Sequence, residues 1–204
     1  MKKVYLTSLV IAVAFSAAFS QGVSGGIRAG MNVANLSSSV GSVPQGVSVT
    51  TADTNTKVGF QFGAYLKIMT SEKFGIQPEL IYSQMGASAP TGQTGSLNLN
   101  YLSIPVLLRF NVTKNFSLQA GPQLGVLLAA SQSNGSTTID TKDATNATDL
   151  GGAFGFGLDF GKFNVGARYY LGFSNLIKDL PAGFDIKQKT NAFQLVLGYQ
   201  LFGK

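Results

Sequence analysis

The sequence contains no cysteine and no histidine. Without cysteine the chain can form no disulfide and offers no thiolate to a metal ion. Without histidine it has no imidazole base for a Ser-His-Asp triad, and neither usual ligand type remains for a zinc site. The Lys and Arg residues are scattered, whereas a nucleic-acid surface needs them clustered. We therefore expect no cofactor, no metal site and no nucleic-acid partner.

Long apolar runs are also scarce, because the sequence has one such run, Leu9 to Phe19. It follows two lysines and ends in Ala18-Phe19-Ser20, a pattern typical of a secretory signal peptide. The run is shorter than the roughly 18 residues that a membrane-spanning helix requires. We expect residues 1–20 to be a cleaved signal peptide and residues 21–204 to form one domain. Any membrane insertion of that domain would have to use strands.

From residue 22 onward, short segments alternate between apolar and polar or small residues, which is the period of a β-strand. The clearest alternation places Val58, Phe60, Phe62, Ala64, Leu66 and Ile68 on one face. Eight segments of this kind can be recognised, at about residues 22–36, 57–69, 73–86, 97–110, 115–130, 150–161, 163–173 and 190–202. A soluble β-sandwich also alternates, so alternation alone does not decide between lipid and a protein core.

The connections between these segments alternate between long and short. The long ones are rich in Ser, Thr, Asn and Gly, and span residues 37–56, 87–96, 131–149 and 174–189. Outer-membrane barrels show this asymmetry. The sequence therefore predicts an all-β fold, an eight-stranded antiparallel up-and-down transmembrane β-barrel in the bacterial outer membrane. Its termini would be periplasmic and its four long loops extracellular.

Large aromatic residues gather on the apolar face beside the short connections: Phe74, Phe110, Phe116, Phe160 and Phe163. A protein core would also accommodate phenylalanine. Their placement at one end favours a girdle at the periplasmic membrane interface.

Charged residues within the predicted strands take the opposite parity, which directs them into the lumen: Arg28, Lys67, Glu79, Arg109, Asp159 and Arg168. An Arg or Lys facing lipid at the bilayer centre would cost about 2–4 kcal/mol. Side chains fill the interior of an eight-stranded barrel, so we expect a buried polar network. The alternative is a narrow conduit in which Arg28, Arg109 and Arg168 attract anions.

Three prolines, Pro78, Pro105 and Pro122, fall inside predicted strands and each removes a ladder donor. A closed barrel has no free edge to accept them, so we expect β-bulges there. Asp140, Asp143 and Asp149 lie in a predicted loop without the spacing of a calcium-binding loop. We expect these three carboxylates to be solvated.

Several short segments resemble the outer-membrane β-barrel family common in Bacteroidetes, often described as porin-family or PorT-like. The segments that carry the resemblance are residues 26–32, 77–83, 101–105, 120–122, 168–172 and 197–199. The resemblance implies that the prolines and a lumen pair, Glu79 and Arg109, belong to a shared architecture, and it implies no catalytic residue.

The pattern favours a structural or porin-like outer-membrane barrel with a largely filled lumen. The alternative, which the PorT resemblance implies, is an accessory component of a secretion or envelope-assembly system. An outer-membrane enzyme is less favoured, because only carboxylate pairs remain as catalytic groups. The expected partners are outer-membrane lipid, the barrel-insertion machinery and envelope or secretion proteins. The sequence leaves the oligomeric state open.

Overall fold

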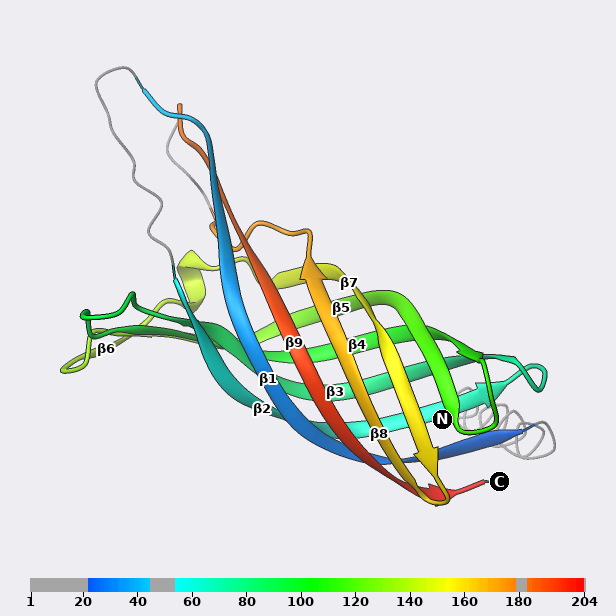
Figure 1. Cartoon of the computed structure of the whole chain (residues 1–204). Coiled ribbons are helices and arrows are strands. Elements are labelled where there is room, and N and C mark those ends of the chain that lie inside the picture. The colour runs from blue at the N-terminus through cyan, green and yellow to red at the C-terminus, as the bar shows by residue number, and fades with distance from the viewer. Residues whose placement is uncertain (1–21, 45–53, 179–182, 204) are drawn as a thin grey trace, which may run out of the picture.

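The computed structural model describes residues 22–44, 54–178 and 183–203, so the predicted signal peptide lies outside the described residues. Eight long antiparallel strands surround a common axis (Figure 1). They are β1 (Val23–Ser42), β2 (Asn55–Met69), β3 (Phe74–Ser88), β4 (Ser96–Asn111), β5 (Phe116–Ser133), β7 (Thr148–Phe160), β8 (Phe163–Gly172) and β9 (Asp185–Phe202). A short strand β6 (Thr138–Asp140) and a 3₁₀ turn η1 (Lys142–Ala144) lie between β5 and β7.

The strands pair in chain order, and the ring closes because β1 pairs with β9 as well as with β2. The pairing of β4 with β5 joins the two halves of the sheet, while β6 adds only to the outer end of β5. This arrangement confirms the predicted eight-stranded up-and-down barrel. In the described part of the chain, no helix is long and apolar enough to cross a membrane.

The alternating sequence pattern becomes two faces of the barrel wall. Apolar side chains such as Phe62, Leu108 and Leu197 lie exposed on the outer face. Their neighbours in sequence point inward and are buried, as Gln61, Arg109 and Leu107 show. Because successive side chains of a strand point to opposite faces, this parity gives an apolar exterior and a mixed, largely polar interior.

The two ends of the barrel differ strongly. Both described chain ends and the short turns lie at one end (Figure 1). The tightest of these turns is Gly161-Lys162, where Gly161 has φ +60°, a value that favours glycine. At the other end β1 and β9 continue beyond the barrel wall as a two-stranded ribbon, with pairing that reaches Ser42 and Asp185. The predicted segments 22–36 and 190–202 were therefore too short at this end.

The predicted bulges at the strand prolines are wrong. Across Pro78 the β2–β3 register stays the same, although the ladder lacks pairs between Tyr65–Glu79 and Ile68–Ile76. Comparable gaps without a register shift occur beside Pro105 and Pro122. A missing N–H thus removes ladder bonds while the flanking pairs keep the strands aligned. The register shifts occur elsewhere, for example between Asn100 and Tyr101.

Candidate functional site in the barrel lumen

The six charged residues that parity directs inward all lie inside the barrel, near the end with the short turns. Glu79 on β3 is the centre of the first group. Arg168 makes a bidentate contact with it, through Nη1 to Oε2 at 2.9 Å and Nη2 to Oε1 at 2.8 Å. Arg28 donates to the same Oε1, and its guanidinium carbon lies 5.0 Å from the centre of the Tyr65 ring. The Glu79 carboxylate therefore forms ion pairs with two arginines.

Asp159 on β7 is the centre of the second group. Its Oδ2 accepts hydrogen bonds from Arg109 and from Lys67 Nζ, the latter at 3.2 Å. Its Oδ1 accepts from Asn164 Nδ2 at 2.8 Å. This group is more open than the first, because the Asp159 side chain is 21% exposed and that of Glu79 only 1%.

Neutral amides join the two groups into one network. Gln77 accepts from Arg109 Nη1 at 3.3 Å and donates to Glu79 Oε1 at 2.7 Å. Asn164 accepts from Arg28 Nη2 at 3.1 Å and donates to Asp159. The pair of Glu79 and Arg109 that the family resemblance implies is therefore not an ion pair, since Gln77 stands between them and Arg109 pairs with Asp159.

Glycines lie opposite the three arginines on neighbouring strands. Arg28 lies opposite Gly63 on β2 and Gly198 on β9, Arg168 opposite Gly155, and Arg109 opposite Gly75. A Cβ at Gly155 would come within 2.1 Å of the Ala167 carbonyl oxygen, so no larger residue fits there. The glycine at position 155 thus follows from the close approach of the β8 backbone.

Each charged residue of the network has an ion-pair partner, and Arg28, Glu79, Arg109 and Arg168 are each at most 4% exposed. Burial of a charge is costly unless a partner and hydrogen bonds compensate it. Bidentate Arg–carboxylate contacts provide that compensation with a fixed geometry. The arrangement is suited to holding the wall rigid, because every guanidinium is already engaged with a protein acceptor.

Two apolar clusters fill the lumen toward the loop end. The first begins one inward-facing position along β4 from Arg109 and consists of Ala34, Met85, Leu107, Ala153, Tyr170 and Ala192. The second lies nearer the loops, on β1, β3, β4, β5 and the β8–β9 connection, and consists of Leu36, Ala87, Leu99, Tyr101, Leu127, Ala130 and Leu176. Asp149, predicted to be a solvated loop residue, is instead buried at the start of β7 with 3% exposure.

The five phenylalanines of the predicted girdle lie on the outer face beside the short turns. Phe74 and Phe110 face each other across β3 and β4 with ring centroids 5.0 Å apart, and Phe163 lies 5.2 Å from Tyr199. Phe116 contacts Phe156 at 6.1 Å, and Phe160 is paired with Phe163 at the β7–β8 turn.

Sequence reasoning missed the amides that bind the charged groups, namely Gln77, Gln119, Asn164 and Asn111. Gln77, Asn111 and Asn164 share the parity of the charged residues on their own strands, so the same inward-facing pattern could have identified them. Gln119 lies on β5, which has no charged residue to mark its inward face. Which amide meets which charge depends on neighbouring strands, as the contact of Arg168 with Gln119 across 49 residues shows.

Sequence comparison identifies the family. A family model described as outer membrane protein beta-barrel domain matches residues 19–178. The chain belongs to this outer-membrane β-barrel family. Membership places it in the bacterial outer membrane, where its apolar outer face lies against lipid. No curated protein matches the sequence.

Solved structures of small outer-membrane barrels resemble this family member. Neisserial surface protein A has a TM-score of 0.56 at 13% identity, with 87% of this chain and 98% of that chain covered. Ail of Yersinia pestis, solved with the heparin analogue sucrose octasulfate, has a TM-score of 0.49 at 16% identity, covering 88% and 99%. OprG of Pseudomonas aeruginosa has a TM-score of 0.48 at 12% identity, with 90% of this chain and 97% of that chain covered. At such identities the likeness to the neisserial protein concerns the fold alone.

Proposed function

We propose that this protein is a closed structural barrel of the outer membrane that displays its long loops outside the cell. One observation carries the proposal: the lumen is occupied by a network in which each charged side chain is ion-paired, with two apolar clusters beyond it. The alternative of an anion-attracting conduit needs arginines that are free to meet the solute. Here Arg28, Arg109 and Arg168 are already engaged with carboxylates of the wall.

The proposed orientation places the termini and short turns in the periplasm and the loops outside. The length asymmetry supports it, because outer-membrane barrels have short periplasmic turns and longer extracellular loops. The phenylalanines beside the short turns would then form the periplasmic-side girdle. The same proposal makes residues 1–20 a cleaved signal peptide, residues 21–204 the mature barrel, and the barrel-insertion machinery its partner during biogenesis.

A PorT-like role in secretion stays a prediction from the sequence resemblance. Catalysis is not part of the proposal, because the two carboxylates of the network, Glu79 and Asp159, are bound by arginines. A general acid or base has to lie within reach of a substrate, and Glu79 is buried inside the barrel.

Lysines at the two ends allow a direct test of the orientation. Lys73, Lys114 and Lys162 are exposed in the short turns, whereas Lys142 and Lys178 are exposed at the loop end. On intact cells, a membrane-impermeant amine reagent is expected to modify the loop lysines and spare the turn lysines, as measured by mass spectrometry of the purified protein. Permeabilised cells serve as the control, in which both groups react. Modification of the turn lysines alone on intact cells would contradict the proposed orientation and indicate the opposite one.

A further inference from the structure

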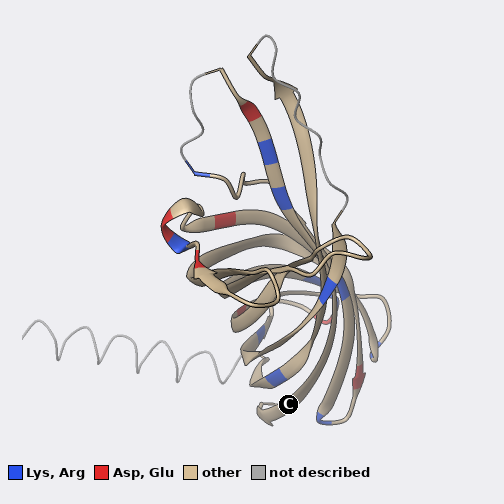
Figure 2. Ribbon diagram, turned by 90° about the vertical axis from the view of Figure 1, so that its left-hand side faces the viewer, with Lys and Arg blue, Asp and Glu red and all other residues tan. Residues whose placement is uncertain are grey.

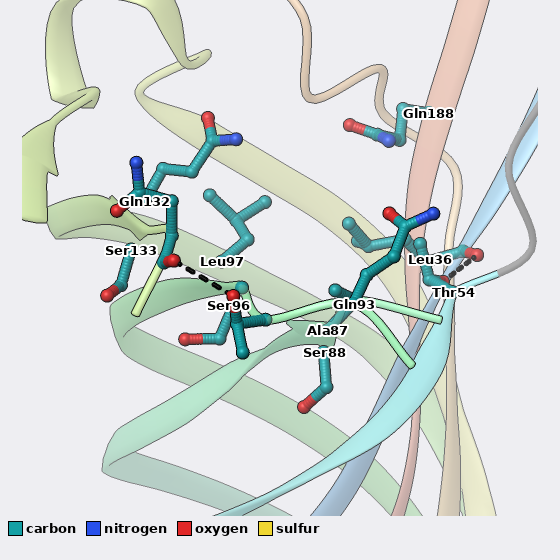
Figure 3. A pocket seen from close by; sticks show the side chains of 14 residues that line it. Leu36, Thr54, Ala87, Ser88, Gln93, Ser96, Leu97, Gln132, Ser133 and Gln188 are labelled. Carbon is teal, nitrogen blue, oxygen red and sulfur yellow. Dashed lines mark hydrogen bonds between the residues drawn. The ribbon is translucent and has the colours of Figure 1, made fainter. Parts of the chain in front are cut away.

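A cavity opens at the loop end, between the β3–β4 connection, the outer part of β5 and the base of the β1–β9 ribbon (Figure 3). Its volume is about 370 Å³, within the range of small-molecule sites. Leu36, Ala87 and Leu97 form an apolar floor that continues into the outer apolar cluster of the lumen. The cavity is thus closed below by the filled barrel and open toward the loops.

Amides and hydroxyls surround this floor. Figure 3 shows Leu97 between Gln132 and Gln93, with Gln188 of β9 on the far side. Within the described chain, the side-chain amides of Gln93 and Gln132 form no hydrogen bond to protein, although each can donate and accept. They are therefore available to a ligand.

Hydrogen bonds between the loops hold the rim of the cavity together. Thr94 Oγ1 donates to the Asn134 carbonyl oxygen at 3.1 Å and so ties the β3–β4 connection to the end of β5. Asn55 Nδ2 donates to the Ala89 carbonyl oxygen at 3.1 Å, and Thr54 Oγ1 to that of Leu36 at 3.1 Å. A site held in this way loses little conformational entropy when a ligand binds.

Charge is absent from the lining, since no described Lys, Arg, Asp or Glu contributes to it. The charged residues beside Gln188 are Lys187 and Lys189, and alternation along β9 directs their side chains to the other face of the ribbon. Figure 2 colours the Lys and Arg positions of the chain blue. Sulfate, phosphate and carboxylate ligands would lack the Arg or Lys contacts that usually bind them. A wholly apolar ligand would leave the rim amides unpaired, which is also unfavourable.

From this lining we propose that the cavity binds a neutral carbohydrate. Its hydroxyls both donate and accept, which matches the amides and serines of the rim, and its C–H face packs on Leu36 and Leu97. The proposal adds a ligand class to the structural role, and its test does not depend on orientation or conductance.

The test is saturation-transfer NMR with the barrel in nanodiscs. The neutral saccharide probes are lactose and N,N′-diacetylchitobiose as free solutes and dextran as an extended glycan. A heparin disaccharide is the anionic comparison, and a neutral tripeptide is the comparison that is not a carbohydrate. At least one neutral probe is expected to receive saturation and the heparin disaccharide none. Response to dextran alone assigns the site to extended glycans rather than free sugars. Response to the heparin disaccharide alone, to a neutral tripeptide alone, or to no probe overturns the proposal.

Substitution of the two cavity glutamines tests whether a responding saccharide binds in this cavity. Gln93→Ala and Gln132→Ala are each expected to weaken binding of the responding saccharide by about three- to tenfold, because each removes one or two ligand hydrogen bonds. Gln200→Ala is the matched control, since it removes the same amide at the opposite end of the barrel. Unchanged affinity in both cavity variants contradicts the assignment, and both side chains are exposed enough that folding should be unaffected.

Discussion

Glu79→Ala is expected to lower the free energy of unfolding of the barrel by about 3–5 kcal/mol, the range for removing one partner of a buried ion pair. Glu79 is the carboxylate that both Arg28 and Arg168 contact, and Gln77 donates to it as well. Its loss would leave two guanidiniums facing the same lumen with no carboxylate between them. The cost arises from the cations that remain, which cannot reach solvent from a position 4% exposed or less.

Urea titration of the barrel in lipid vesicles, followed by the electrophoretic shift between folded and unfolded bands, measures this change. Glu72→Ala is the control, because Glu72 is exposed in the turn between β2 and β3. Its effect is expected to stay within about 0.5 kcal/mol. If Glu79→Ala cost less than about 1 kcal/mol, the network would be a solvated cluster rather than a buried one.

The second large effect concerns the outer face. Leu195→Arg is expected to destabilise the barrel by about 2–4 kcal/mol, because Leu195 is 49% exposed on the lipid-facing side of β9. It lies two outward-facing positions beyond Tyr199, the partner of Phe163 in the girdle, so a cation there meets hydrocarbon. The neighbours of Leu195 across the sheet are Met31 of β1 and Ala167 of β8, and neither offers a polar group to the guanidinium.

Leu201→Arg provides the matched comparison. Leu201 is 57% exposed on the same face, close to the end of β9, where an arginine reaches the interface and costs about 0–1 kcal/mol. The same urea titration applies to both variants. An equal loss of unfolding free energy in the two variants would contradict the placement of the bilayer core along the apolar outer face.

The alternating segments were enough to predict the number of strands and their up-and-down order. They also predicted that Arg28, Glu79 and Arg168 point inward, because parity is a local property of a strand. Pairing is not local. The contact between Glu79 and Arg168 joins residues 89 positions apart, and the family resemblance had instead placed Glu79 with Arg109. Only the relative stagger of the strands decides between them.

The outer extensions of β1 and β9 were missed for a different reason. Residues such as Ser37, Ser38 and Ser39 on β1 are polar on both faces, because a ribbon beyond the barrel has no lipid and no core to distinguish its sides. The loop-end cavity was equally invisible in the sequence. Its Gln93 and Gln132 are ordinary loop and strand-end residues until the fold brings them around one floor.

Single-channel recording of residues 21–204 refolded in planar bilayers tests the closed lumen most directly. An Arg109→Ala variant is recorded beside it, and the electrophoretic band shift verifies folding of both. The wild-type barrel is expected to show no stable openings, and Arg109→Ala is expected to remain silent because the two apolar clusters still fill the lumen. Stable wild-type openings whose conductance or ion selectivity changes in Arg109→Ala would contradict the closed barrel and establish an arginine-lined conduit.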